Sequence, residues 1–434
     1  MDISENKIVR LKASSLKGLN SLKQLDLSKN NISSWLAINP RTLFEPTVSL
    51  TELSLSGNPL TSFSTNDDSL LIISDSLRYL DLSHCKITKV TGHQVLQGMK
   101  NLKHLNLASN YIRGVSDIDS DSLITLDLSS NKLTNLLPNM LSSLPVLSYI
   151  DLSRNHRIAL QTKQGEYVQS TSLKVIDLSH CNMDNIELEG FPALTTAILK
   201  ENMIRELTKE SFINTKTIEH LDLSQNSINS VLPSAFKNLK HLKTLDLSFN
   251  LIPKLERETF KDNDLLVKLD LSRNNINRLN RINAPSLNYL NLTWCMVMIV
   301  DPDAISGMPE LIQLDLSNNL IKDFPDTLYS ENLQKIDLSM NRMTNIKNST
   351  FAGFPDISSI NLSGNRFTVP FKREFFDENL YLVELFLGDN PWLCDCRDML
   401  AFHTFITDPP AKVWEKQSLR CQSPENVAGK TWVK

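Results

Sequence analysis

Aspartates recur along this chain at one place in a short motif, between two apolar residues. Alternate residues of a β-strand point to opposite faces, so an Asp between two inward apolar residues points outward. Parallel strands in register would bring such carboxylates to about 5 Å from one another, where like charges destabilise a sheet unless they are hydrogen-bonded. Flanking serines such as Ser224 and Ser248 can supply donors, so the motif is either an ordinary strand consensus or an acidic surface that selects a basic partner. The eleven aspartates are Asp2, Asp26, Asp81, Asp127, Asp151, Asp177, Asp222, Asp246, Asp270, Asp315 and Asp337.

Large side chains interrupt this regularity at outward or lateral positions. Aromatic residues on a rigid sheet supply contact area at little cost in conformational entropy, although single aromatic residues are also common on protein surfaces. Histidines among them could change charge between about pH 7 and 5 and alter partner affinity. The irregular residues are Tyr79, His84, His104, Tyr149, His180, His220, Phe249, Tyr289 and Trp294. As ligand-binding candidates we select Tyr79, His104, Tyr149, Asp151, Asp177, His220, Asp222, Asp246, Phe249 and Asp270.

Composition argues against several classes of function. Serine, aspartate and histidine recur as parts of a repeat rather than as one constellation, and no phosphate-binding loop, dinucleotide fingerprint or zinc-protease motif occurs. We therefore expect no enzymatic activity, no cofactor and no metal. The net charge of -4, from 45 basic and 49 acidic residues, gives no reason to expect nucleic acid as a partner. No apolar run approaches the roughly 20 residues of a membrane helix.

The elements that carry these residues follow from a repeat, L-x-x-L-x-L-x-x-N, with an average period of 24 residues. A period in this range predicts a solenoid in which each repeat supplies one short strand and a return segment around one continuous core. In one unit Leu245 and Leu247 would point inward, and phenylalanines of the return segments, such as Phe236, would pack behind the strands. The seventeen closing positions are Asn6, Asn30, Asn58, Cys85, Asn110, Asn131, Asn155, Cys181, Asn202, Asn226, Asn250, Asn274, Cys295, Asn319, Asn341, Asn365 and Asn390.

The closing asparagines have a structural role that requires no ligand. A buried turn leaves main-chain donors and acceptors that a side-chain amide can satisfy in neighbouring repeats. A small thiol with a weak donor can take the same place. We therefore expect Cys85, Cys181 and Cys295 to be buried and unpaired.

The segment after the last repeat contains N-P-W-L-C-D-C at residues 390–396 and a further cysteine, Cys421. The repeats and this segment together resemble extracellular leucine-rich repeat proteins, chaoptin-like adhesion proteins and Toll-like receptor ectodomains among them. The resemblance implies an α/β fold: a leucine-rich repeat solenoid, or horseshoe, of about 17 repeats with a parallel concave sheet and an irregular convex side. It implies a solenoid over residues 1–390 and a cysteine-bearing cap over 391–434.

In the family's cap the first cysteine pairs with the third and the second with the fourth. By resemblance Cys394 pairs with Cys421, and Cys396 lacks a partner because the chain stops at Lys434. A zinc site built from these cysteines and His403 would be a poor ligand set. Disulfides imply an oxidising compartment, hence an extracellular or cell-surface location.

Four N-x-S/T motifs fit glycosylation of a secreted protein, although chance also produces them in an Asn-rich chain. Two of the acceptors, Asn291 and Asn361, lie at outward strand positions, where a glycan would obstruct the concave sheet. We therefore expect a concave ligand to bind between Leu77 and Asn274. The acceptors are Asn31, Asn291, Asn348 and Asn361.

The first residues already form the end of a repeat, without a signal peptide or a polar cap, so we expect a fragment of a longer protein. The predicted function is an extracellular recognition module of a cell-surface adhesion or receptor protein that binds protein or glycoconjugate ligands on the concave sheet. Two alternatives are an innate-immune Toll-like receptor ectodomain and a secreted carrier that sequesters a ligand. Homodimers and heterodimers both stay open, as does a membrane anchor in the missing C-terminal part.

Overall fold

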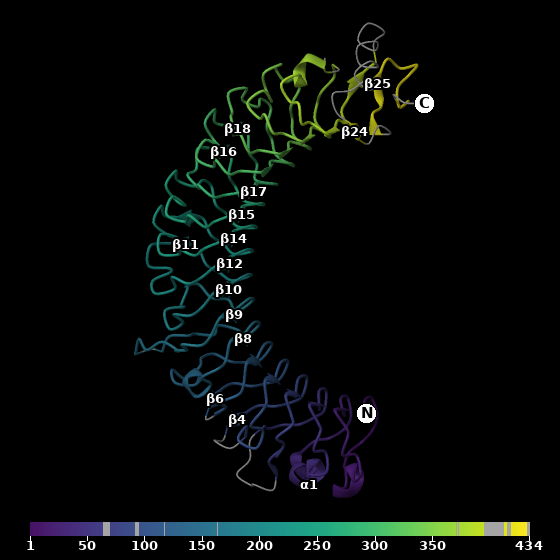
Figure 1. Cartoon of the computed structure of the whole chain (residues 1–434), viewed down its shortest axis with the longest axis vertical. Helices are drawn as coiled ribbons and strands as arrows, with labels where there is room; N and C mark the ends of the chain where they lie inside the picture. Colours follow the sequence, from purple (N-terminus) through teal and green to yellow (C-terminus); the bar gives the residue numbers. More distant parts are fainter. Residues whose placement is uncertain are drawn as a thin grey trace. The chain divides into compact units, whose positions relative to one another are not determined.

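The computed structural model describes residues 1–63, 70–91, 95–116, 118–162, 164–369, 371, 373–394, 412–414 and 418–431. The chain forms two compact units. Unit 1 comprises Met1–Ile204 with Ser211–Ile218, and unit 2 comprises Arg205–Glu210 with Glu219–Lys434. In each unit short strands line one side and irregular return segments form the other, as Figure 1 shows.

In unit 1 each repeat after the first supplies one strand to a parallel sheet, and each of these strands pairs with the next one along the chain. A single central residue of each strand is buried, because alternation over so short a strand leaves only one inward position. Asp2 joins the same sheet through a bridge to Asp26. The strands are β1 (Gln24–Asp26), β2 (Glu52–Ser54), β3 (Tyr79–Asp81), β5 (His104–Asn106), β7 (Thr125–Asp127), β8 (Tyr149–Asp151), β9 (Val175–Asp177) and β10 (Thr196–Ile198).

Unit 2 repeats this arrangement, again with parallel strands in register. Its last strand pairs with the sheet after the end of the regular repeats. The strands are β12 (His220–Asp222), β14 (Thr244–Asp246), β15 (Lys268–Asp270), β17 (Tyr289–Asn291), β19 (Gln313–Asp315), β20 (Lys335–Asp337), β21 (Ser359–Asn361), β22 (Glu384–Phe386) and β24 (Lys412–Trp414). We call the sheet formed by these strands, in either unit, the main sheet.

The return segments contain little regular structure. Their strands form two-stranded pairs: β4 (Val90–Thr91) with β6 (Val115–Ser116), β11 (Glu206–Leu207) with β13 (Ser230–Val231), β16 (Arg278–Leu279) with β18 (Ile299–Val300), and β23 (Trp392–Leu393) with β25 (Cys421–Ser423). Described helices are the α-helix α1 (Pro40–Phe44) and the 3-10 turns η1 (Ala13–Leu16), η2 (Trp35–Ala37), η4 (Leu141–Ser143) and η5 (Arg373–Phe376). The predicted parallel-sheet solenoid with an irregular return side is confirmed.

The core lies between the main sheet and the return segments. Leu245 and Leu247 are buried as predicted. The phenylalanines of successive return segments stack on one another, and the ring centroids of Phe236 and Phe260 are 5.4 Å apart. Phe351 stacks at 6.0 Å on Phe376 in the same manner. Each repeat therefore completes the core of its neighbour, as a solenoid requires.

The closing asparagines bind main-chain groups of their own and the preceding repeat. Asn58 donates from Nδ2 to the carbonyl oxygens of Leu27 and Leu55, both at 2.9 Å. Its Oδ1 accepts the backbone N–H of Ile32 at 3.0 Å. Asn58 is 1% exposed, so water cannot reach this turn, and the side-chain amide supplies the hydrogen bonds that water would otherwise make. The predicted structural role is confirmed, and we call this row the asparagine ladder.

The three ladder cysteines are buried and form no disulfide. Each thiol lies near a carbonyl of the preceding repeat, as Cys295 Sγ does to Leu271 O at 3.0 Å. Burial raises the pKa of the Cys85 and Cys181 thiols to about 11 and that of Cys295 to about 12. The prediction of buried, unpaired thiols is confirmed.

The residue just before each ladder position adopts a left-handed backbone conformation. Glycine occupies this place at Gly57 and Gly364, but elsewhere side chains as large as Phe249 (φ 53°) and Trp294 (φ 58°) do so. The N–H of this residue donates to a carbonyl of the next repeat, as from Phe249 to Ser272 at 2.8 Å. We call this row of residues the edge row.

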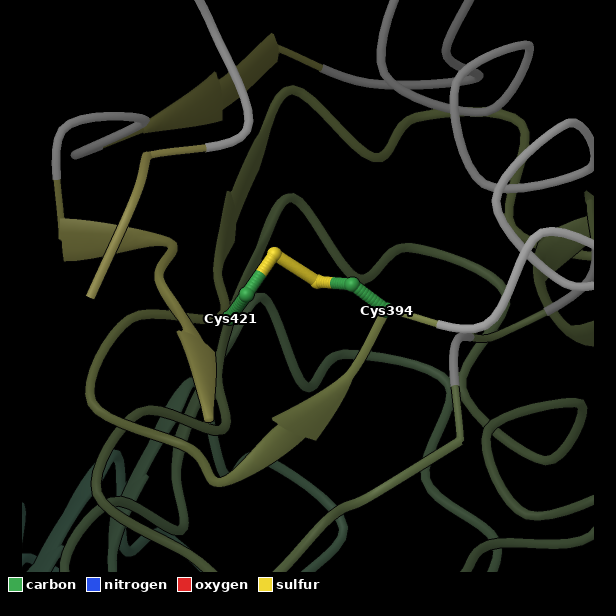
Figure 2. Close-up of a disulfide and its surroundings, with 2 residues drawn as sticks. All are labelled: Cys394 and Cys421. Carbon is green, nitrogen blue, oxygen red and sulfur yellow. A yellow bond between two sulfur atoms is a disulfide. The ribbon is translucent and has the colours of Figure 1, made fainter. Parts of the chain in front are cut away.

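A disulfide joins Cys394 to Cys421, with Cα atoms 5.6 Å apart (Figure 2). The pairing of β23 with β25 brings the two residues together, since Trp392 is the register partner of Cys421. The pairing implied by resemblance is confirmed. Cys396 and His403 lie outside the described residues, so the fate of Cys396 stays a prediction, as does the boundary between solenoid and cap.

Candidate functional site

Three predicted aromatic candidates in unit 1 occupy one row across the main sheet. Strand register aligns Tyr79 with His104, His104 with Thr125, and Thr125 with Tyr149. The rings of Tyr79 and His104 are 6.4 Å apart, and His104 Nδ1 lies 2.8 Å from the Thr125 hydroxyl. We call these four residues the aromatic row. Each of its rings projects from a strand fixed by two neighbours, so the row is rigid before any ligand binds.

The carboxylates of Asp127, Asp151 and Asp177 form a parallel row beside it, the acidic row, also aligned by register. Each Oδ1 accepts the backbone N–H of the serine two residues later at 2.8 Å. The prediction that flanking serines supply donors is confirmed, also for Ser224 and Ser248 in unit 2. The donor is the backbone N–H of the serine, and at Asp177 the Ser179 hydroxyl adds a second bond. The recurring Asp therefore has a structural role, closing the turn after each strand.

The acidic row also shapes the electrostatics of its neighbours. Burial raises the pKa of Asp151, hydrogen bonds from Ser153 oppose that shift, and the nearby charges of Asp177 and Asp127 add to it. Burial likewise raises the pKa of Tyr149 to about 12, and the carboxylates of the acidic row reinforce the effect. The surface thus presents negative charge beside neutral phenol groups. It suits a partner that brings cationic and hydrogen-bonding groups.

Unit 2 carries a related arrangement with different charge. His220, Thr244, Lys268 and Tyr289 are successive register partners, and Lys268 Nζ lies 5.4 Å from the Tyr289 ring centroid. His220 Nδ1 lies 2.9 Å from the Thr244 hydroxyl. Lys268 places a positive charge in this row of outward side chains, whereas the aromatic row of unit 1 contains no lysine or arginine.

Beside this row the predicted candidates Asp222, Asp246 and Asp270 are aligned by register. Burial raises the pKa of Asp246, hydrogen bonds from Ser248 oppose that shift, and the two neighbouring aspartates add to it. Asp270 Oδ2 also accepts from Asn291 Nδ2 at 2.9 Å. The predicted candidates thus fall into two sets, one in each unit.

Phe249 belongs to the edge row rather than to a strand, and it is 47% exposed. The guanidinium of Arg273 lies 4.8 Å from the Phe249 ring centroid and 5.2 Å from that of Trp294. Both partners lie in the same row, one repeat to either side of Arg273. Sequence reasoning named the two aromatic residues and missed the arginine, because nothing in a single repeat marks it. The available signal was that Phe249, Arg273 and Trp294 occupy the same position in three successive repeats, directly before the ladder residue.

The four predicted glycosylation sites differ in their surroundings. Asn31 and Asn348 are exposed. Asn291 and Asn361 instead take the place of the recurring aspartate, and each donates from Nδ2 to the carboxylate of the preceding strand at 2.9 Å. A glycan on either of them would attach to an amide nitrogen already engaged in a hydrogen bond. Occupancy of all four sites stays a prediction.

The two other histidines predicted at outward or lateral positions, His84 and His180, lie in different surroundings. His84 is exposed in the edge row, whereas His180 lies 2.9 Å from Glu201 and 3.3 Å from Arg154. Among the described residues, no group of three or more His, Cys, Asp or Glu side chains could hold a metal ion. The same residues include no helix long and apolar enough to cross a membrane.

Family models describe most of the chain as leucine-rich repeats. The general leucine rich repeat model matches residues 1–64, 192–252 and 240–297, and a two-copy model matches 75–120. A model of the BspA type leucine rich repeat region matches 282–382, and two further repeat models match 122–144 and 169–186. The chain belongs to the leucine-rich repeat proteins.

Characterised relatives are similar over part of their length. Human lumican is 26% identical over 224 residues, which are 49% of this chain and 62% of lumican. The zebrafish (Danio rerio) transforming growth factor beta activator LRRC33 is 27% identical over 216 residues, 47% of this chain and 27% of that protein. The chain thus spans less than two thirds of these relatives, which are extracellular matrix or cell-surface proteins.

Solved structures share the fold along nearly the whole chain. Toll in its complex with Spatzle, from Drosophila, aligns with a TM-score of 0.71 at 18% identity, covering 98% of this chain and 62% of Toll. A leucine-rich repeat protein of Leptospira interrogans aligns with a TM-score of 0.63 at 21% identity over 95% of this chain and 94% of its own. TLR13 in complex with ssRNA13 has a TM-score of 0.57 at 19% identity, with coverages of 97% and 82%.

Proposed function

We propose that this chain is the extracellular recognition part of a cell-surface adhesion or receptor protein, and that it binds a protein ligand on the main sheet of unit 1. The observation that carries the proposal is the aromatic row beside the acidic row. The Cys394–Cys421 disulfide supports an oxidising location, as do the matrix and cell-surface relatives.

The geometry of the two rows suits a ligand segment with basic and apolar side chains. Tyr79 is 36% exposed, and its contact with His104 restrains both rings before binding. Exposed aromatic residues held in this way lose little side-chain entropy when a partner covers them. The adjacent carboxylates would attract a basic ligand and fix its orientation more than they would add affinity.

The test uses an array of purified secreted proteins and receptor ectodomains, probed with the chain, followed by surface plasmon resonance on each binder. We expect Tyr79→Ala combined with Tyr149→Ala to raise the Kd about 30-fold, the effect of losing about 2 kcal/mol at an interface anchor. Tyr381→Ala is the matched control, because Tyr381 is 65% exposed and lies outside both rows. We also expect Asp151→Asn to slow association, most at low salt.

Two results would refute the proposal. One is an array without any binder, and the other is a binder whose Kd is unchanged in the double variant. A ligand footprint centred on Trp294 and Asn361 of the glycosylated protein would refute the expectation that ligands bind between Leu77 and Asn274. It would move the site to unit 2.

The two alternative functions rest on the same fold. A Toll-like receptor ectodomain is favoured by the likeness to Toll and TLR13, and a secreted carrier by the likeness to lumican. The sequence of the full transcript distinguishes them. A signalling domain after a membrane segment would favour the receptor, and a stop codon soon after Lys434 would favour the carrier.

A further inference from the structure

Unit 1 has a hollow of about 750 Å³ on the return side, beside the β4 and β6 pair. Three successive repeats line it, through residues that follow their ladder positions by one to six places. This volume is typical of sites for small organic ligands, which run from about 300 to 1,000 Å³. We call it the basic pocket.

Three cationic side chains line the basic pocket: Lys89, Arg113 and Lys132. All three are exposed, and none forms an ion pair with a residue that the structure describes. No carboxylate is among the described residues that line the hollow. A concentration of unpaired positive charge in a chain of net charge -4 calls for an anion supplied from outside.

The rest of the wall is apolar or aromatic. Tyr111 is 47% exposed and Leu137 is 50% exposed, while Val115 forms a buried floor. Lys132 Nζ lies 4.8 Å from the Tyr111 ring centroid, and both side chains line the hollow. A ligand that fits must therefore combine a ring or other apolar body with anionic groups.

Gly114 keeps the hollow open. It lines the pocket, and a Cβ added to it would meet no atom within 4 Å. Its backbone lies outside the left-handed region, so neither strain nor packing demands a glycine there. A larger side chain at this position would fill the ligand's space while leaving the fold and the three cations intact.

We infer that the basic pocket binds an anionic saccharide, with its sulfate or phosphate ester groups on Lys89, Arg113 and Lys132 and a sugar ring against Tyr111 and Leu137. A guanidinium and two ammonium groups match the several oxygens of such esters. This site lies on the return side, so it is separate from the protein-binding surface proposed above.

Isothermal titration calorimetry of the whole chain with a trisulfated heparin disaccharide tests the inference. Saturable binding is expected, together with a loss of at least about tenfold in affinity in the variant Lys89→Gln/Arg113→Gln. Gly114→Met should weaken binding comparably without any change of charge. The matched control is Arg10→Gln/Lys17→Gln, which removes the same number of charges from exposed positions elsewhere in unit 1. It should bind as the unchanged chain does.

Further ligands distinguish a sulfated sugar from a phosphorylated sugar and from a free anion. The desulfated disaccharide should not bind, inorganic sulfate should bind far more weakly than the disaccharide, and tighter binding of glucose 6-phosphate would assign the pocket to phosphorylated sugars. Absence of binding by both ester-bearing sugars would overturn the inference. Equal binding by the pocket and control variants, by the desulfated sugar, or by sulfate alone would do the same. Tyr79→Ala with Tyr149→Ala should leave saccharide binding unchanged, so the two proposals fail independently.

Discussion

Removal of one side chain from the asparagine ladder should test the structural logic of the repeat. Asn250 is 4% exposed and sits between two repeats of unit 2. It donates to Leu223 O and Leu247 O, both at 3.0 Å, and accepts the N–H of Ile228 at 2.9 Å. A fourth bond runs from Nδ2 to Ser248 O at 3.2 Å, and Asn250→Ala would remove all four.

The expected destabilisation follows from the groups left behind. A buried donor or acceptor that loses its partner costs about 1 to 3 kcal/mol. Asn226 Nδ2 also donates to Leu223 O at 3.1 Å, and Asn274 Nδ2 also donates to Leu247 O at 2.9 Å. Each of these carbonyls therefore keeps one amide donor in Asn250→Ala, whereas the N–H of Ile228 loses the acceptor that Asn250 supplies. We therefore expect Asn250→Ala to lower the free energy of unfolding by about 2 to 4 kcal/mol, mostly from the unpaired N–H of Ile228. Asn250→Cys should cost about half as much, because a ladder thiol keeps one bond of this kind.

Denaturant unfolding followed by circular dichroism gives the overall change, and hydrogen exchange at the Ile228 amide reports the local one. Hydrogen exchange matters here because a solenoid can open one repeat at a time. Asn275→Ala is the matched control, since Asn275 is exposed and directly follows a ladder residue. A change below about 0.5 kcal/mol in Asn250→Ala, or one equal to the control, would refute the reasoning.

Three further outcomes are expected. Asp246→Asn should keep the turn closed, as Asn291 does at its own position, and should raise stability at pH 7 by a fraction of a kcal/mol by removing like-charge contacts. Because the folded-state pKa of Asp246 is raised, the wild type should regain this difference in stability as the pH falls through that pKa towards the ordinary pKa of an aspartate. A difference that grows on acidification would contradict the argument. The ladder cysteines should stay unreactive towards a thiol reagent at pH 8 until denaturant is added, since their pKa values are about 11 to 12; label found by peptide mapping on Cys85, Cys181 or Cys295 of the native chain would show that they are accessible. Cys394→Ser with Cys421→Ser should destabilise the cap by about 3 to 4 kcal/mol, from the 27-residue separation, as measured by proteolysis, and an unchanged digestion rate would disprove this.

The repeat made the fold predictable. Alternation alone placed Leu245 and Leu247 in the core, and the family resemblance implied the Cys394–Cys421 pair. The first depends on spacing that every repeat restates, and the second on the resemblance of the segment after the last repeat to the family's cap. The sequence also indicated that serines donate to the aspartates, but it could not specify the donor atom, because the direction of the backbone N–H depends on the turn after the strand.

Features that cross repeats were not predictable in the same way. Arg273 meets Phe249 and Trp294 only because three coils place their edge-row residues at one level. The basic pocket collects Lys89 and Arg113 from unlike positions of different repeats, so no single-repeat pattern signals it. Contacts of this kind depend on how adjacent repeats stack. The length of the repeat can be read from the sequence, but the positions of side chains in one repeat relative to those in the next cannot.

The left-handed conformation along the edge row has an evolutionary consequence. For residues other than glycine it costs roughly 1 to 2 kcal/mol at each coil, and the hydrogen bond to the next coil helps to hold it. Because the main chain alone makes that bond, the identity of the side chain is left unconstrained: lysine, histidine, tryptophan and methionine all occur there. Each coil thus displays one replaceable side chain at a fixed position. A single substitution there can change the chemistry of the surface while the core stays the same.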